Sequence, residues 1–116
     1  MKNKFTILGS GSSLGAPWIT NYMGKLKKNS KNIRTRCCAH IKYGNLSILI
    51  DTSPDIKSQF LKNKINSLDA IIYTHEHADQ TSGIFEMRPF FWKNKKKIPV
   101  YGSKRTINAL ISKYTF

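Results

Sequence analysis

Acidic residues are scarce in this sequence: its 116 residues include 6 Asp and Glu against 20 Lys and Arg, which gives a formal net charge of +14. The chain also lacks a long apolar run, and roughly 20 consecutive apolar residues are needed to span a bilayer. Cysteine is limited to the adjacent pair Cys37 and Cys38. Neighbouring positions strain a disulfide and do not match zinc-knuckle spacing. We therefore expect no membrane span and no disulfide framework, with one buried thiol and one incidental thiol.

The length and composition favour one small globular domain. Hydrophobic residues make up 40% of the 116 residues and aromatic residues 11%, enough for a core. The first residues, "MKNKFTILGS", have a positive head but too few apolar residues for a signal peptide. We therefore expect a cytoplasmic protein in a reducing compartment.

The basic excess has two interpretations. One is compositional drift in a sequence rich in Lys, Asn and Ile, and the other is a polyanionic partner such as RNA. The densest basic clusters lie in residues 24–36 and 93–97, both of which read as loops. Because charge runs alone are weak indicators of binding, we favour drift with solvated loops over a nucleic-acid-facing surface.

The apolar pattern predicts alternating strands and helices. Strands are expected at residues 5–8, 37–43, 46–52, 68–75 and 98–102. Helices are expected from Ser53, where Pro54 and Asp55 suit a first turn, and at residues 103–114, with a shorter one limited by Pro89. Residues 18–36 form a long loop. This order of elements predicts an α/β layered fold.

Two of the three histidines and two of the six acidic residues fall within "THEHADQTSG", residues 74–83. In an extended segment, residues two apart face the same way, so His75 and His77 can offer nitrogens to one metal ion. The carboxylate of Asp79 can reach a second ion about 3.5–4 Å from the first. These ligands suit zinc, with manganese or iron as alternatives. The sequence therefore predicts a metal site at the carboxyl end of the buried strand 68–75.

The same stretch resembles the H-x-H-x-D-H motif of metallo-β-lactamase-fold hydrolases. The segments "ILGSGSSLGAP", "ILIDTSPDIKSQFL" and "IPVYGS" also follow the order found in the branch of the phosphoribosyl cyclic phosphate phosphodiesterase and the tRNA 3′-processing endonuclease. The resemblance covers nearly the whole chain. It implies that residues 1–116 are the N-terminal half of an αββα sandwich, a mixed sheet with flanking helices. It also implies two divalent ions and hydrolysis of a phosphodiester, small molecule or RNA, by a metal-bound hydroxide.

By this resemblance, His75 and His77 hold the first metal, and Asp79 holds the second and is the catalytic carboxylate. Asp51 would orient a ligand imidazole from behind, although an ordinary strand-end residue is the alternative. Gln80 stands where the family motif has a fourth metal-binding His. Its amide oxygen would be a weaker, neutral ligand, or it is simply tolerated.

Three arginines are candidates for contacting a substrate phosphate, because Arg forms bidentate bonds with phosphate. They are Arg34, Arg36 and Arg88. Solvated or ion-paired arginines are the alternative interpretation. The third histidine, His40, lies on a predicted strand and is read as structural.

The family's later motifs have no counterpart in this chain. Two imidazoles and one carboxylate do not close a tetrahedral site, and one sheet of a two-sheet sandwich leaves an apolar face bare. We therefore expect the chain alone to be a poor enzyme, completed by a companion chain or by self-association. The alternatives are an inactive split or decayed gene product and a basic nucleic-acid-binding fragment.

Overall fold

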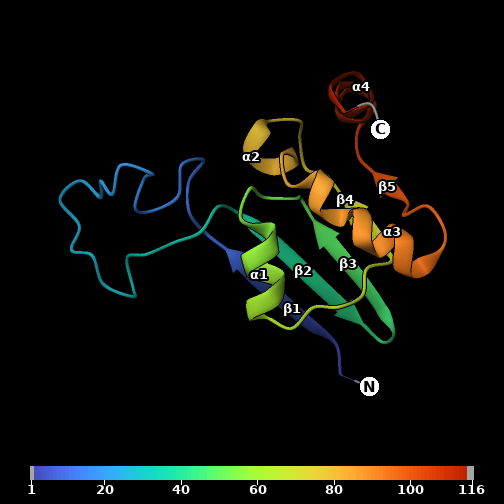
Figure 1. Ribbon diagram of the computed structural model, residues 1–116, viewed down its shortest axis with the longest axis horizontal. Coiled ribbons are helices and arrows are strands. Elements are labelled where there is room, and N and C mark those ends of the chain that lie inside the picture. Colours follow the sequence, from blue (N-terminus) through green and yellow to red (C-terminus); the bar gives the residue numbers. More distant parts are fainter. Residues whose placement is uncertain (1, 115–116) are drawn as a thin grey trace.

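The computed structural model describes residues 2–114, which form one five-stranded sheet flanked by helices (Figure 1). The strands lie in the order β1 (Lys4–Gly9), β2 (Cys38–Tyr43), β3 (Leu46–Ile50), β4 (Ala70–Ile72) and β5 (Val100–Tyr101). The helices are α1 (Ile56–Lys62), α2 (Ala78–Thr81), the 3-10 helix η1 (Ile84–Met87), α3 (Arg88–Asn94) and α4 (Lys104–Lys113). The predicted α/β order of elements is confirmed.

The strand directions bring several chain connections to one edge of the sheet. β1 and β2 pair antiparallel, as do β2 and β3, whereas β3, β4 and β5 run parallel. The carboxyl ends of β3 and β4 therefore meet at the same edge, next to the end of β1 and the start of β2. As expected, the short apolar strand β4 lies inside the sheet, between β3 and β5. The segment after β4 carries the histidine pair to this edge.

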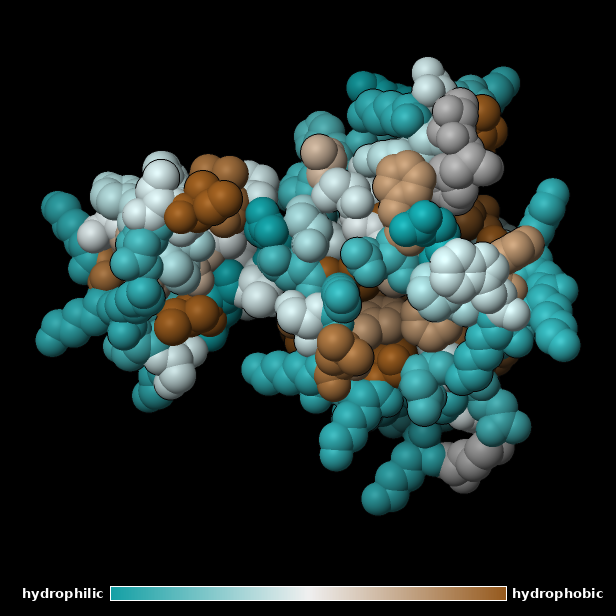
Figure 2. Space-filling model, in the orientation of Figure 1, coloured by the Kyte–Doolittle hydropathy of each residue, from teal (hydrophilic) through white to brown (hydrophobic). Residues whose placement is uncertain are grey.

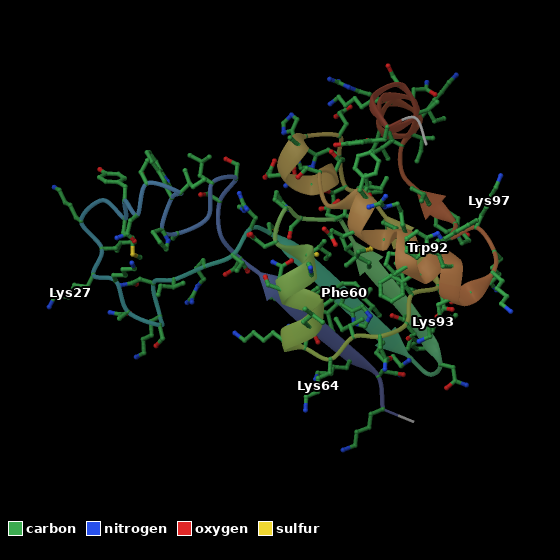
Figure 3. The ribbon with its side chains drawn as sticks, in the orientation of Figure 1. Lys27, Phe60, Lys64, Trp92, Lys93 and Lys97 are labelled. Carbon is green, nitrogen blue, oxygen red and sulfur yellow. The ribbon has the colours of Figure 1, made fainter. Side chains whose placement is uncertain are left out.

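One face of the sheet is covered by helices. Leu49 and Ile71 point from β3 and β4 into the core, where they are 0% and 2% exposed. Figure 1 shows α1 and α3 in front of this face, and Phe60 of α1 meets Phe90 of α3 with ring centroids 5.7 Å apart (Figure 3). Each fully buried side chain of this size stabilises the fold by about 1.5–3 kcal/mol.

The other face of the sheet is apolar and bare. The pairing register sets Phe5 beside Ile41 and Ile7 beside Ala39, and the second row continues through Ile50 and Ile72. The outer members of these rows remain exposed: Phe5 by 61% and Ile7 by 67%. An uncovered row of this kind is typical of a surface that another element packs against.

Two helix starts differ from the sequence prediction. α1 begins at Ile56 rather than Ser53, because the chain first forms a turn in which the Ser53 carbonyl accepts from the Ile56 amide and the Ser53 hydroxyl from the Asp55 amide. The Asp55 carboxylate does not cap the helix and is bonded to Arg36. Pro89, expected to limit a helix, instead lies in the first turn of α3. That position suits proline, since the first amide groups of a helix have no partner within it.

Residues 10–37 leave the sheet edge as a long projection (Figure 1). Its base is closed by isolated bridges between Gly11 and Arg36 and between Ala16 and Arg34. Figure 2 shows hydrophobic and hydrophilic residues side by side on this projection. Of the lysines labelled in Figure 3, Lys27 lies on the projection, whereas Lys64, Lys93 and Lys97 lie on the body.

The two cysteines behave as predicted. Both are free thiols, with Cys37 exposed and Cys38 buried. Burial raises the pKa of the Cys38 thiol to about 12. In residues 2–114, no helix is both long and apolar enough to cross a bilayer.

Candidate metal centre

The segment that follows β4, residues 73–83, is here called the histidine loop. Its two imidazoles lie against each other, with ring centroids 4.6 Å apart and ring planes at 77°. His77 has an extended backbone and is the residue before α2 begins at Ala78. The loop thus places two imidazoles together at the sheet edge, as the two-residue spacing predicts.

A hydrogen-bonded relay fixes the ring of His75. Asp51, at the end of β3, accepts from the Thr74 amide at 2.9 Å and from the Thr74 hydroxyl at 2.8 Å. The Thr74 oxygen also lies 2.9 Å from Nδ1 of His75. Because the single hydroxyl proton of Thr74 goes to the carboxylate, Nδ1 of His75 must be the protonated donor. In the neutral imidazole, Nε2 is then the nitrogen with the free lone pair, which is the atom available to a metal ion.

Asp51 is the buried anchor of this relay. It is 4% exposed, and burial raises the pKa of its carboxyl while the Thr74 hydrogen bonds act in the opposite direction. The backbone of Asp51 adopts φ +64, a left-handed conformation that short polar side chains tolerate. Asp51 thus reaches His75 through Thr74 rather than directly.

Asp79 and Gln80 lie on the first turn of α2. The Gln80 amide nitrogen donates to the Asp79 carboxylate at 2.9 Å. Gln80 is 7% exposed, and its Oε1 is buried without a hydrogen-bond partner among the described residues. Leaving a buried acceptor unsatisfied costs about 1–3 kcal/mol. A cation or a further donor near Oε1 would remove that cost.

Buried hydroxyls hold the histidine loop against the turn after β3. The Thr52 amide donates to the Gln80 carbonyl at 2.7 Å, and the Thr52 hydroxyl lies 2.8 Å from the Tyr73 hydroxyl. Burial raises the pKa of Tyr73, which keeps its phenol protonated. Gly83 packs so closely on this turn that a Cβ there would overlap the Ser53 carbonyl oxygen.

The side chain of Glu76, between the two histidines, contacts α4 and not the imidazoles. Its carboxylate accepts from Nε of Arg105 on α4 at 3.0 Å. The acidic residue in the middle of the motif therefore connects the loop to α4 instead of joining the imidazoles.

The structure does not bring the three predicted phosphate-binding arginines together. Arg36 forms a two-pronged ion pair with Asp55 at 2.7 and 2.8 Å. Arg34 bonds carbonyl oxygens within the projection. Arg88 donates to the Phe85 carbonyl and lies over the Phe85 ring. The ion-paired alternative describes Arg36, and a contact of any of the three with substrate stays a prediction.

The donors at this edge suit a divalent metal ion, but they are few. His75 and His77 supply two imidazoles, and Asp79 and Gln80 supply oxygens from the following turn. Within residues 2–114, no three His, Cys, Asp or Glu side chains are grouped closely enough to hold a metal ion. The chemistry of the donors therefore fits part of a metal site rather than a closed one.

Sequence reasoning did not find three contributors to this edge. Thr74 connects Asp51 to His75, and Thr52 and Tyr73 support the loop from below. The available signal was weak: a hydroxyl residue directly before the first histidine, and another directly after Asp51. Hydroxyl partners depend on tertiary contacts that no spacing rule specifies.

A family model described as "Beta-lactamase superfamily domain" matches residues 47–116, more than half of this chain. The curated protein named octanoyltransferase from Porphyromonas gingivalis is 33% identical over 107 residues, which are 90% of this chain and 21% of that protein. Most of that protein therefore lies outside the match.

Solved structures share the fold. A diphosphatase of the PhnP family is 33% identical, with a TM-score of 0.87 over 97% of this chain and 46% of its own. The zinc-bound PqqB of Methylobacterium extorquens is 16% identical, with a TM-score of 0.72 over 96% of this chain and 43% of its own. The metallo-beta-lactamase fold protein YhfI of Bacillus subtilis is 21% identical, with a TM-score of 0.65, and 41% of it is covered. The chain thus spans less than half the length of these proteins.

Proposed function

The chain belongs to the beta-lactamase superfamily of metallo-β-lactamase-fold hydrolases, and we propose that its histidine loop is the metal-binding part of a phosphodiester hydrolase. The observation that supports this most directly is the relay from Asp51 through Thr74, which in the neutral ring of His75 selects the tautomer with its lone pair on Nε2, beside the His77 ring. The oriented His75 ring and the adjacent His77 ring are suited to one divalent ion, for which zinc is our first choice and manganese or iron the alternatives.

Each residue of the edge has a role in this proposal. His75 and His77 hold the first ion, and Asp79 with the Gln80 amide oxygen faces a second. Thr74 and Asp51 keep the His75 ring in one orientation and one tautomer. When bound, divalent ions supply Lewis-acid activation of water and of the phosphoryl group. The buried Oε1 of Gln80, which has no hydrogen-bond partner within residues 2–114, supports a nearby cation, because a cation would satisfy that oxygen.

The substrate class rests on the resemblance to phosphodiesterases and on one relative. The 33% identical solved structure is that of a diphosphatase, which favours chemistry at phosphorus. A phosphoanhydride is therefore the second candidate substrate beside the phosphodiester. The octanoyltransferase supports no acyl substrate, because the match covers 21% of it.

The proposal includes a partner for the bare sheet face. Residues 1–116 would form the N-terminal half of the domain, and the remaining metal donors would come from a companion segment or a second copy of the chain. Phe5 and Ile7 on the bare face would pack against that partner. Alone, the chain would bind metal weakly and turn over slowly, because the donors present do not close a site.

Zinc binding by matched variants tests the metal assignment. We expect zinc to bind the wild-type chain in equilibrium dialysis and His77→Ala to lose it. Glu76→Gln is the matched control, since Glu76 lies between the histidines but contacts Arg105. Full zinc occupancy in His77→Ala, measured by elemental analysis, would show that the loop is not the metal site.

The reaction is tested with the zinc-loaded chain on bis(p-nitrophenyl) phosphate and on inorganic pyrophosphate. Slow hydrolysis that disappears in His77→Ala and persists in Glu76→Gln supports the proposal, and the preferred compound identifies the bond that is cleaved. Zinc binding without turnover of either compound, also after addition of the second half of a longer relative, would favour the inactive split or decayed product.

A further inference from the structure

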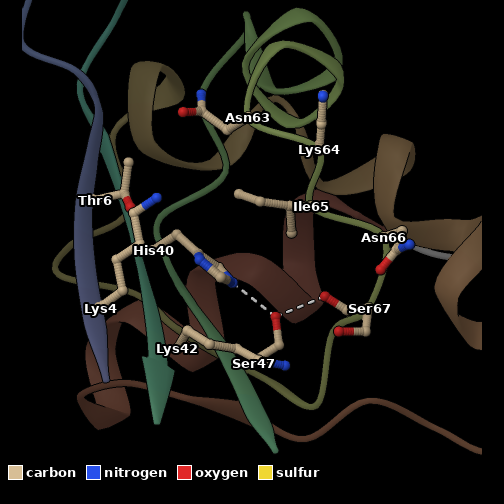
Figure 4. Close-up of a pocket in the computed structure, with 10 residues that line it drawn as sticks. All are labelled: Lys4, Thr6, His40, Lys42, Ser47, Asn63, Lys64, Ile65, Asn66 and Ser67. Atoms are coloured by element: carbon tan, nitrogen blue, oxygen red, sulfur yellow. Dashed lines mark hydrogen bonds between the residues drawn. The ribbon is translucent and has the colours of Figure 1, made fainter. Parts of the chain in front are cut away.

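We propose that a second site, a basic pocket on the helix-covered face of the sheet, binds a phosphate or phosphomonoester group. The pocket has a volume of about 220 Å³ and lies between the strands β1, β2 and β3 and the segment that follows α1 (Figure 4). Its charged and polar lining includes Lys4, Lys42, Lys64, His40, Ser47 and Thr6.

The first observation is a pair of lysines directly opposite each other. Lys4 of β1 pairs with Lys42 of β2, and Lys42 pairs with Ser47 of β3, so the three form one row across the sheet. Like charges in directly opposite positions destabilise a sheet, because their Cβ atoms are only about 4.5–5.5 Å apart. Lys64, in the segment that follows α1, adds a third positive charge. An anion bound between these lysines would turn the repulsion into attraction.

The second observation is that no acidic residue lines the pocket. None of the ten lining residues is Asp or Glu. Among residues 2–114, the ion pairs are Arg36 with Asp55 and Arg105 with Glu76, and neither involves a pocket lysine. The nearby carboxylate is that of Asp69, which accepts from the amide of the lining residue Ser47 at 2.8 Å, so one negative charge stands beside three lysines. The lysines outnumber this acid, so the pocket keeps an excess of positive charge, and a concave site of one sign concentrates counter-ions.

The third observation is an ordered polar floor. His40 is 6% exposed, and its Nε2 lies 2.7 Å from the Ser47 hydroxyl, which in turn donates to the Ser67 carbonyl at 2.6 Å (Figure 4). Because Ser47 has a single proton to donate, Nε2 of His40 is the donor to Ser47. Burial, with Lys42 and Lys4 next in importance, lowers the pKa of His40. The positive charges of the two lysines thus act on the buried imidazole, and they would act on a bound oxyanion in the same place.

The pocket is separate from the histidine loop. Ser47 is the second residue of the strand β3, which ends just before Asp51, and four residues of strand span about 13 Å. The pocket lies at the opposite end of β3 from the imidazoles. Its ligand is therefore distinct from a group held at the candidate metal centre, and the inference stands or fails independently of the proposed reaction.

Titration with inorganic phosphate tests the inference. The chain is treated with EDTA and followed by ¹H–¹⁵N NMR at constant ionic strength, with chloride as the reference anion. We expect saturable shifts at the Ser47 and Lys42 amides and at the His40 ring. In Lys4→Gln/Lys42→Gln, binding should weaken at least tenfold, which corresponds to 1.4 kcal/mol. The matched control Lys57→Gln/Lys104→Gln removes the same charge from exposed positions outside the pocket and should bind like the wild type.

Two results would overturn the inference. Equal weakening in both double variants would mean that phosphate responds to the overall charge of the chain. Shifts confined to the histidine loop, or no saturable shift at all, would mean that the pocket does not hold the anion. Because the lysines are on the surface side of the pocket and His40 is left unchanged, both double variants should fold, which the dispersion of their spectra verifies.

Discussion

The relay from Asp51 to His75 predicts a specific effect of Thr74→Val. Valine has nearly the shape of threonine but lacks the hydroxyl that donates to Asp51 and accepts from Nδ1 of His75. The Asp51 carboxylate keeps its bond from the residue 74 amide at 2.9 Å. The variant therefore removes only the hydrogen bond to the imidazole. It shows how much the orientation of the His75 ring contributes to metal binding while the ring itself is still present.

The expected magnitudes follow from what is lost. Removal of a group that orients a metal ligand weakens metal affinity by about 10- to 100-fold. Loss of one hydrogen bond to a charged group lowers the free energy of unfolding by about 1.5–3 kcal/mol. We therefore expect a folded protein whose zinc affinity falls by one to two orders of magnitude. His75 should also lose its preference for the Nδ1-protonated tautomer.

Zinc affinity is measured by competition with a chromophoric chelator, and the tautomer by the ¹⁵N shifts of the imidazole in the metal-free protein. Thr74→Ser keeps the hydroxyl and should resemble the wild type in both. The reasoning is refuted if Thr74→Val binds zinc as tightly as Thr74→Ser, or if the His75 tautomer is the same in all three proteins.

Three further predictions concern the fold around the site. Gly83→Ala should lower the free energy of unfolding by about 2 kcal/mol through steric overlap, whereas Gly102→Ala, whose Cβ would meet neighbours at 3.5 Å, should be near neutral in urea unfolding. The hydrogen bond from Arg36 lowers the pKa of Asp55, so this carboxylate stabilises the fold above its unfolded pKa of about 3.9 and loses that effect as the pH falls toward the folded value. Asp55→Asn should therefore cost about 1 kcal/mol at pH 7 and nothing near the acid limit; an equal cost at both pH values would contradict the ion pair. Ile7→Gln should reduce self-association measured by light scattering. Leu61→Gln, at a similarly exposed position on α1, should not. Equal self-association of the two variants would argue against the bare sheet face as the surface through which copies associate.

The sequence predicted the arrangement of elements well because the strands are marked by strong local patterns. "LSILI" and "AII" are apolar and β-branched, and both are interior strands. Helix starts were less accurate. The pattern predicts Asp55 inside the first turn of the helix, but Asp55 precedes α1 and its carboxylate is bonded to Arg36, 19 positions away. A rule based on neighbouring residues cannot include an ion pair with so distant a partner.

In the candidate site too, features that depend on local sequence were predicted and features that depend on tertiary contacts were not. The proximity of His75 and His77 follows from their spacing, which is local information. The contact of Asp51 with Thr74 depends on β3 lying next to β4, and the buried state of Gln80 depends on the turn after β3. The opposed lysines of the basic pocket likewise appear only once the strand register is known. The resemblance therefore pointed to Asp51 and Gln80, but their contacts, and the hydroxyl partners Thr52 and Thr74, became visible only in the structure.

The closed base of the projection has a consequence for how this protein tolerates change. The bridges at Gly11–Arg36 and Ala16–Arg34 fix the two ends of the segment next to the sheet edge, so its outer part, around residues 17–33, is an independent appendage. Each doubling in length of a flexible loop costs only about 0.6 kcal/mol. Insertions, deletions or a fused peptide at the tip should therefore leave the histidine loop in place. We expect related proteins to differ in the length and side chains of this projection while they keep the site beneath it.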